Sequence, residues 1–265
     1  MIFLNNVPIV PTIFPDGTSQ VWKLDPNLLE PSPSNKIRWD FSHEGEFIQL
    51  AQLVMLLKHY GCNSTLEIKY LPYGRQDKEI SNKTTFALHV FAKLLNTLDL
   101  KEVIIHDPHS EAALQLINNS QAIYPYAELD VIIAEIGTNM ICFPDAGARS
   151  KYAKEYIVDC PFIYGEKKRN QLTGNIFNYI LIGDPSNKNV LIVDDICDGG
   201  MTFKLLAKEL LEKGANEVNL FVTHGIFSKG LKTLYESGIN YIFTQNGEVS
   251  ELKGEITYRR LAYHA

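Results

Sequence analysis

A short stretch in the C-terminal half of the chain brings together acids, glycines and a threonine whose chemistry suits a sugar phosphate. The residues are Asp194, Asp195, Asp198, Gly199, Gly200 and Thr202. Glycines let backbone amides approach an anion closely, the N-terminus of a following helix favours phosphate, and a threonine hydroxyl adds a donor. Two adjacent acids after an apolar run can accept hydrogen bonds from sugar hydroxyls or hold a metal ion. A strand followed by an N-capping Asp198 would explain the glycine turn, but it would not explain the acid pair.

Charged, histidine and glycine residues also follow other apolar runs that have the pattern of strands. The candidate ligand-binding residues there are Arg75, Gln76, Asp77, His109, Asp145, Ala146 and Gly147. Arg75 offers a planar donor fork for phosphate oxygens, and Gln76 can read an adenine edge. His109 and Asp145 suit a Mg²⁺ ion that shares its shell with phosphates and water. Each of these residues alone could belong to a polar turn, and a lone histidine is often a hydrogen-bonding loop residue.

The spacing of apolar residues predicts the elements that must position these side chains. Three segments have helical spacing and five have the pattern of strands: helices at 46–60, 84–98 and 202–213, and strands at 66–71, 103–106, 139–143, 190–193 and 218–222. Residues 31–35 have the turn chemistry of a loop. Strands that alternate with helices and are too apolar to face water predict an α/β fold with a mainly parallel sheet. Ligands bind such sheets at the carboxyl ends of the strands, where the candidate residues fall.

Length, charge and cysteine content exclude several classes of protein. The 265 residues suit one large α/β domain or two smaller ones, and 45% hydrophobic content predicts a globular chain. A net charge of −6 argues against binding nucleic acid through bulk charge. The four cysteines lie far apart, which argues against a zinc ribbon, and no run approaches the length of a membrane span. We therefore expect a cytoplasmic protein whose thiols are packing residues.

The acid pair and its glycine sequel, residues 190–202, resemble the phosphoribosyl-diphosphate (PRPP) binding motif of type I phosphoribosyltransferases and of PRPP synthetases. Residues 70–78 and 105–110 resemble two ATP-binding segments that only the synthetases have. Further resemblances follow in family order over residues 12–245: an early turn at 14–17, a diphosphate loop at 144–149, a mobile catalytic loop at 166–169 and a Thr-His strand end at 223–228. Most of the chain thus resembles the ribose-phosphate pyrophosphokinase (PRPP synthetase) family.

This resemblance implies two phosphoribosyltransferase-like halves, each a mainly parallel sheet flanked by helices. Residues 1–125 would carry the ATP-binding segments, and residues 126–265 the diphosphate, catalytic and ribose-phosphate loops. The implied ATP-binding residues are Phe14, Asp16, Arg75, Gln76, Asp77 and His109. Lys167 and Arg169 would be catalytic, although a short cationic run is usually a solvated loop. Asp145, Ala146 and Gly147 would form the diphosphate loop, with His109 and Asp145 on Mg²⁺.

The implied reaction transfers the β,γ-diphosphate of ATP to the anomeric hydroxyl of a ribose 5-phosphate moiety and releases AMP. Asp194, Asp195 and the glycine loop would bind the ribose phosphate. The loop departs from the family pattern Asp-Thr-Gly-Gly-Thr, because the first Thr is lost and Met201 replaces a small residue. Fewer hydroxyl donors and a changed shape lead us to hypothesise a larger acceptor with an esterified 5-phosphate, such as ADP-ribose. Thr18 also replaces an acid after the early turn, two residues are missing after Asp145, and both ends are shorter.

Two other functions stay open at this point. A phosphoribosyltransferase would use PRPP and a base, but it would not need the segments that contain Arg75 and His109. A non-catalytic homologue could regulate a true synthetase, but it would not need to keep Lys167, Arg169 and both acids. The expected partners are ATP and a ribose-phosphate acceptor, with neither nucleic acid nor membrane, and we expect a homo-oligomer.

Overall fold

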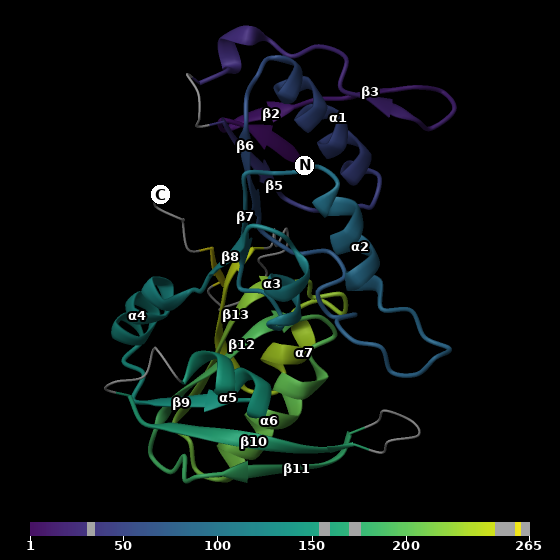
Figure 1. Ribbon diagram of the computed structural model, residues 1–265. Coiled ribbons are helices and arrows are strands. Elements are labelled where there is room, and N and C mark those ends of the chain that lie inside the picture. The colour runs from purple at the N-terminus through teal and green to yellow at the C-terminus, as the bar shows by residue number, and fades with distance from the viewer. Residues whose placement is uncertain (31–34, 154–159, 170–175, 247–257, 261–265) are drawn as a thin grey trace. The chain divides into compact units, whose positions relative to one another are not determined.

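The computed structural model describes residues 1–265 except 31–34, 154–159, 170–175, 247–257 and 261–265. The chain divides into two compact units, Met1–Tyr124 and Pro125–Ala265 (Figure 1). Each unit has its own sheet and its own apolar core. No helix in the described part of the chain is long and apolar enough to cross a membrane.

Unit 1 is built on a six-stranded sheet in the order β2-β1-β5-β6-β7-β8. Its strands are β1 Ile2–Leu4, β2 Val7–Ile9, β5 Asn35–Trp39, β6 Ser64–Ile68, β7 Glu102–His106 and β8 Ser120–Ile123. The four strands from β5 to β8 are parallel, whereas β1 is antiparallel to both of its neighbours. A two-stranded hairpin of β3 Thr12–Ile13 and β4 Ser19–Gln20 lies outside this sheet. The parallel part confirms the predicted α/β organisation.

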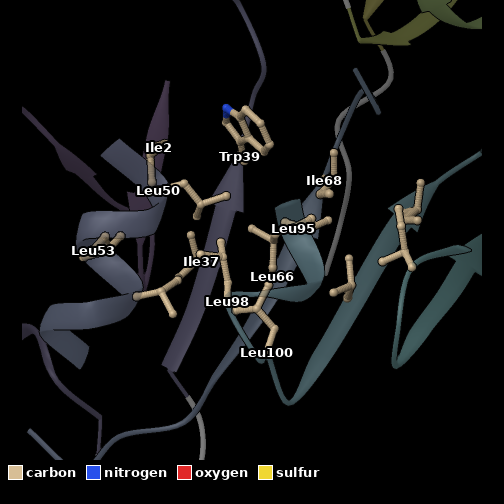
Figure 2. Close-up of a cluster of buried hydrophobic side chains, with 14 of the residues drawn as sticks. Ile2, Ile37, Trp39, Leu50, Leu53, Leu66, Ile68, Leu95, Leu98 and Leu100 are labelled. Carbon is tan, nitrogen blue, oxygen red and sulfur yellow. The ribbon is translucent and has the colours of Figure 1, made fainter. Parts of the chain in front are cut away.

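The helices of unit 1 bury one face of that sheet. They are α1 Glu46–His59, α2 Ala87–Asn96, α3 Ala112–Leu116 and the short 3₁₀ helix Pro26–Leu28. Alternate strand residues such as Ile37, Leu66 and Ile68 are fully buried beneath Leu50, Leu53 and Leu95 of the helices (Figure 2). Because side chains alternate along a strand, Glu67 between Leu66 and Ile68 points to the opposite face.

Unit 2 is built on a seven-stranded sheet in the order β11-β10-β9-β12-β13-β14-β15. Its strands are β9 Met140–Phe143, β10 Phe162–Arg169, β11 Ile176–Ile182, β12 Asn189–Cys197, β13 Glu217–Gly225, β14 Ile239–Asn246 and β15 Tyr258–Arg260. All neighbours are parallel except β10 and β11. The helices are α4 Tyr126–Glu135, α5 Ala146–Tyr152, α6 Met201–Glu212 and α7 Lys232–Tyr235.

Helices cover both faces of the unit 2 sheet, as the apolar character of its strands predicts. Val190 and Ile192 of β12 pack with residues of α6 in one buried cluster. Leu191 and Val193 point the other way and pack with residues of α4 and α5 in a second cluster. Strand β12 is therefore held from both sides up to the residue before Asp194, which fixes the point where the acid pair begins.

The strand predicted at 66–71 spans Ser64–Ile68 instead, and two other predicted boundaries are wrong for identifiable reasons. The helix predicted from residue 84 begins at Ala87, because Thr84 Oγ1 accepts from the amides of Ile80 and Ser81 at 3.1 and 2.9 Å and closes a turn instead. Asn35, predicted to be in a loop, is the buried first residue of β5. Its Oδ1 accepts hydrogen bonds from Asn5 Nδ2 at 3.0 Å and from the Glu30 amide at 3.1 Å, so side-chain bonds stabilise the start of this strand.

Candidate active site

The carboxyl ends of three strands place the candidate residues of unit 2 at one edge of its sheet. In the parallel ladders, Phe143 of β9 lies beside Tyr164 of β10, and Cys142 lies beside Ile192 of β12. Asp145 follows the end of β9, and Asp194 lies two residues past Ile192 in β12. Strand β10 continues past Tyr164 to Arg169. The predicted diphosphate loop, acid pair and basic residues thus share this edge in their backbone positions.

The acid pair carries concentrated negative charge. Asp194 is half-buried, and its pKa is raised well above the ordinary range, first by burial and then by the charges of Asp195 and Asp145. The Asp195 amide donates to Asp194 Oδ1 at 3.0 Å, and Lys151 Nζ lies 3.3 Å from Asp195 Oδ2. The Lys151 and Asp195 side chains are only 14% and 7% exposed. Three acids next to one lysine favour further positive charge or hydrogen-bond donors at this edge.

Helix α5 connects the predicted diphosphate loop to the neighbouring strands. Asp145 caps its N-terminus, with Oδ1 accepting from the Ala148 amide at 3.0 Å, while Ala146 and Gly147 are exposed. One turn later, the guanidinium of Arg149 lies 4.1 Å from the ring centroid of Tyr164 in β10. Lys151 reaches the acid pair on the opposite side. The helix therefore holds the loop by polar contacts to both β10 and β12.

The glycine loop, residues 198–202, has a fixed backbone. Gly200 has a φ of 72°, in the left-handed region, and a Cβ at this position would lie 2.9 Å from Leu234 Cδ2. Both the conformation and the close approach require glycine. Asp198 Oδ1 accepts from Ser228 Oγ at 2.5 Å, and the Met201 side chain is 60% exposed at the first position of α6. Gly199 is exposed, which leaves its backbone accessible to an anion.

Residues 166–169 belong to β10, which corrects the mobile loop that the resemblance implies. Lys167 pairs with Tyr179 and Lys168 with Asn178 of β11, and the register shifts between Lys168 and Arg169. The partner strand satisfies backbone hydrogen bonds that a loop would leave to water, so the chain stays extended there. The side chains of Lys167 and Arg169 lie outside the described part of the structure, so their catalytic roles stay predictions.

In unit 1, the structure brings the two predicted ATP-binding segments together. A Cβ on buried Gly74 would lie 3.9 Å from the Cβ of His109, so Arg75 and His109 come from adjacent segments. Arg75, Gln76 and His109 are exposed, and Asp77 is half-buried. The Gln76 amide donates to the Tyr73 carbonyl at 2.9 Å, and its carbonyl accepts from the Leu88 amide of α2 at 3.2 Å. This turn holds exposed polar side chains next to the end of β7.

Phe14 and Asp16 lie apart from these segments within unit 1. They occupy the turn of the β3–β4 hairpin, where Asp16 Oδ1 accepts from the Thr18 amide and hydroxyl at 3.0 and 2.7 Å. Figure 1 shows β3 beside α1, at the opposite end of the unit from α3. Gln52 of α1 anchors the hairpin through hydrogen bonds at 2.7 and 3.0 Å. Their assignment to ATP therefore rests on the sequence resemblance.

A cluster of Glu67, Lys69 and His106 was missed by the sequence analysis. Glu67 Oε1 lies 2.6 Å from both Lys69 Nζ and His106 Nε2, and the last two atoms are 3.1 Å apart. The hydrogen bond from His106 lowers the Glu67 pKa to about 2, with Lys69 adding to the effect against burial. The cluster joins β6 and β7 directly before the segments that contain Arg75 and His109. The sequence did contain a signal, because the polar residues Glu67 and Lys69 alternate with apolar residues at the end of β6. The sequence analysis used this alternation only to predict the strand.

The donor chemistry fits a Mg²⁺ ion only if a substrate completes its shell. Among the residues that the structure describes, no group of three or more His, Cys, Asp or Glu side chains could by itself hold a metal ion. His109 and Asp145, the predicted ligands, belong to different units. Burial and then the neighbouring carboxylates raise the pKa of Asp194, and a hard cation with oxygen ligands would relieve the repulsion between these carboxylates.

Comparisons with known proteins agree with this geometry. Residues 141–245, from β9 to β14, match the family model of the phosphoribosyl transferase domain. The chain is 31% identical over 191 residues to ribose-phosphate pyrophosphokinase 2 of Schizosaccharomyces pombe, covering 69% of this chain and 59% of that protein. It is 25% identical over 256 residues to the ribose-phosphate pyrophosphokinase of Saccharolobus solfataricus, covering 91% and 86%.

A solved structure gives the same result for the fold. The phosphoribosylpyrophosphate synthetase of Mycobacterium smegmatis superposes with a TM-score of 0.74 at 20% identity, covering 97% of this chain and 88% of that one. The chain thus has the two-unit architecture of a synthetase, with two mainly parallel sheets flanked by helices. On the motifs, the matching domain and these relatives together, the chain belongs to the ribose-phosphate pyrophosphokinase family.

Proposed function

We propose that this protein is an ATP-dependent diphosphokinase that transfers a diphosphate to the anomeric hydroxyl of a ribose 5-phosphate moiety. The observation that carries the proposal is the shared sheet edge in unit 2. Asp145 follows the end of β9, and the acid pair and the backbone of Lys167–Arg169 lie in the C-terminal parts of β12 and β10, the two parallel neighbours of β9. This is where open α/β sheets bind ligands. The chain spans less than two thirds of the length of its Schizosaccharomyces pombe relative, so the activity is proposed on the site.

In the proposed reaction, the anomeric oxygen of the acceptor forms a bond to the β-phosphorus of ATP. The bond between that phosphorus and the bridging oxygen to the α-phosphate breaks, AMP leaves, and the hydroxyl proton passes to solvent. Such transfers ask little covalent chemistry of a protein, so positioning and charge stabilisation dominate. Asp194 and Asp195 would accept from the ribose hydroxyls and set the angle of attack. Lys167 and Arg169 would neutralise charge that develops on the transferred diphosphate.

ATP is assigned to unit 1. Arg75 would bind phosphate oxygens, Gln76 would read the adenine edge, and Asp77 and His109 would complete the site. The contact between Gly74 and His109 supports this assignment, because it holds the two segments side by side. Phe14 and Asp16 are assigned to ATP through the family resemblance.

Mg²⁺ is proposed as the cofactor. Bound Mg²⁺ would offset the negative charge of the phosphate groups. Asp145 in unit 2 and His109 in unit 1 are its proposed protein ligands. Mg²⁺ keeps water and phosphate oxygens in its shell, so it needs few protein ligands.

The acceptor is either ribose 5-phosphate or a 5-substituted ribosyl phosphate such as ADP-ribose, and exposed Met201 favours the second. Its side chain, 60% exposed beside Gly200, replaces the small residue of the family pattern. A bulky apolar side chain at the opening of the loop suits contact with a substituent on the phosphate. The lost threonine hydroxyl matters less for a singly charged, substituted phosphate than for a free dianion.

A direct assay tests the activity and the acceptor together. The full-length protein is incubated with ATP, Mg²⁺ and either ribose 5-phosphate or ADP-ribose, and AMP and the diphosphorylated sugar are quantified by mass spectrometry. We expect AMP and product in equal amounts, with ADP-ribose the better acceptor. Turnover of ribose 5-phosphate without any of ADP-ribose would sink the acceptor hypothesis. Consumption of PRPP with a base, without AMP release, would instead indicate a phosphoribosyltransferase.

Two substitutions test catalysis by the basic residues, with their neighbour as control. Lys167→Ala and Arg169→Ala should lower kcat by about 100-fold or more while changing the KM for ATP little, because their contacts strengthen in the transition state. Lys168→Ala should stay within a few-fold of wild type. A purely KM-based loss in the first two variants would refute the transition-state role.

If wild type is inactive but stimulates an authentic synthetase, the regulatory alternative holds.

A homo-oligomer, dimer or higher, is also proposed from the family resemblance. Multi-angle light scattering on the purified protein measures its mass directly. A mass at the 30.0 kDa of the single chain, independent of concentration, would refute this proposal.

A further inference from the structure

The segment that follows β13, residues 226–230, is fastened to the glycine loop. The amides of Ile226 and Phe227 both donate to the Cys197 carbonyl, at 2.8 and 3.1 Å. Ser228 Oγ donates to Asp198 Oδ1 at 2.5 Å. Three hydrogen bonds therefore hold this segment along the start of the loop. The sequence analysis did not predict that residues 226–230 lie beside the glycine loop.

The backbone of this segment is fixed by its own packing. Phe227 has a φ of 47°, and its ring occupies the space next to Gly225, where a Cβ would lie 2.1 Å from the ring atom Cε2. The Gly230 amide donates to the Phe227 carbonyl at 2.7 Å and closes a tight turn. Residues 228 and 229 lie within that turn, so their side chains leave the backbone from defined positions.

Lys229 lies directly beside Gly199. A Cβ built on Gly199 would stand 3.7 Å from Lys229 Cγ, which is ordinary van der Waals contact. Its methylene stem therefore lies alongside the loop. Because the lysine is exposed, its ammonium can reach an anion at the exposed Gly199 backbone. The acidic residues at the loop edge, Asp194, Asp195 and Asp198, outnumber Lys151, whose ammonium already lies 3.3 Å from Asp195 Oδ2. A phosphate that approaches this loop therefore needs a nearby cation.

We propose that Lys229 binds a phosphate group of the ribosyl phosphate acceptor and is a specificity-determining residue of that site. This inference rests on the proposed function, because it takes residues 198–202 as the acceptor's phosphate loop. The ammonium offsets the acidic charge of the loop and supplies a donor where the loop has lost a threonine hydroxyl. A lysine can bind the terminal phosphate of ribose 5-phosphate or the substituted phosphate of ADP-ribose. The experiment therefore compares both acceptors, to distinguish which phosphate Lys229 binds.

The test compares Lys229→Met with Lys232→Met in the full-length protein. Methionine keeps an unbranched stem but removes the charge. Lys232 is a matched control, because its side chain is 85% exposed and its ion pair with Glu236, at 3.8 Å, is on the surface of α7. We expect Lys229→Met to raise the acceptor KM about tenfold, or about 1.4 kcal/mol, with little change in kcat or in the KM for ATP. Lys229→Arg should recover most of the affinity, and Lys232→Met should match wild type.

Comparing the two acceptors shows which phosphate group Lys229 binds. A larger KM increase for ribose 5-phosphate than for ADP-ribose assigns Lys229 to the free dianion, whereas equal increases assign it to a phosphate that both acceptors present alike. Calorimetric titration of each acceptor into wild type and Lys229→Met measures the same loss without turnover. If wild type is active but Lys229→Met changes neither the KM nor the binding constant for either acceptor, the inference about Lys229 is overturned. The proposed function would still stand. A wild-type protein that neither binds nor converts either acceptor overturns the proposed function and the inference with it.

Discussion

Glu67 shows how a single carboxylate can organise two segments of the chain. Its Oε1 is shared by Lys69 and His106 at 2.6 Å each, and its pKa of about 2 means that it stays ionised at all physiological pH values. The same oxygen therefore fixes the last residues before both proposed ATP-binding segments. Glu67, which we do not expect to contact the substrate, thus helps to position the residues that are proposed to bind ATP.

Replacing Glu67 by Gln should remove a pH-dependent contribution to stability. A carboxyl whose folded pKa is lowered stabilises the protein above its unfolded value, and that stability is lost as pH falls toward the folded value. The lowering of the Glu67 pKa from 4.5 to about 2 corresponds to about 3 kcal/mol at neutral pH. We expect Glu67→Gln to lower the free energy of unfolding in urea by about that amount at pH 7, with the difference from wild type shrinking between pH 4.5 and 2.

Glu102→Gln is the control for that experiment. Glu102 lies on β7 and accepts from Thr65 Oγ1 of β6 at 3.2 Å, so it also joins the two strands through a side chain. We expect a loss below about 1 kcal/mol for this half-exposed hydrogen bond. A parallel pH dependence in both variants would show that the Glu67 cluster is not its source.

Asp194 should give the opposite result. Burial and the neighbouring acids raise its folded pKa, so its ionised form costs stability at neutral pH. With metal ions removed by EDTA, Asp194→Asn should therefore melt at a higher temperature than wild type at pH 8, and the gain should vanish below about pH 3.8. Turnover should fall sharply in the same variant. A lower melting temperature at pH 8 would contradict the assigned charge repulsion.

At the scale of elements, the start of α6 depends on Gly200. Alanine there would need a left-handed backbone and would place Cβ 2.9 Å from Leu234 Cδ2. We expect Gly200→Ala to lower the free energy of unfolding by about 1–3 kcal/mol and to weaken acceptor binding. Gly199→Ala is the matched variant, because its Cβ would meet Lys229 Cγ at an ordinary 3.7 Å, and we expect less than about 1 kcal/mol. Equal losses in urea unfolding would refute this distinction.

The elements that sequence analysis predicted are those with strong local patterns. Strand β12 was recognised because four consecutive apolar residues precede an acid pair, and α6 because its apolar residues recur at helical spacing. Strands β1 and β2, three residues each, were not predicted, because so short a segment becomes a strand only when a neighbour pairs with it. The pairing of β10 with β11 was missed for another reason, because the family resemblance assigned residues 166–169 to a loop although β10 has eight residues and β11 seven.

The candidate site was predictable where the chemistry lies in one segment. The glycine loop and its acids could be identified from residue types alone. Lys229 could not, because its contact with Gly199 spans thirty positions of sequence and depends on how the turn after β13 packs. Glu67, Lys69 and His106 likewise come together only through the register of β6 and β7.

At the scale of the whole molecule, the two units have separate apolar cores. Leu66 belongs to the core of unit 1, and Leu220 to one of the two clusters of unit 2. Leu66→Ala should cost about 2–5 kcal/mol and raise amide hydrogen exchange mainly in β5, β6 and β7. Leu220→Ala should do the same mainly in β12 and β13. Mass spectrometry of exchanged peptides reads both units at once, and identical exchange maps for the two variants would show that the units unfold as one.

The contact between Gly200 and Leu234 also shapes how the acceptor preference of this lineage can diversify. Any side chain at position 200 meets both a left-handed backbone and a packed leucine, so that position offers selection almost no tolerated variants. Met201 follows it in the sequence and Lys229 lies beside Gly199, both with exposed side chains, so we expect these two positions to tolerate many substitutions. Natural drift and directed-evolution libraries alike would therefore find new sugar specificities at these two positions, with Gly200 held constant.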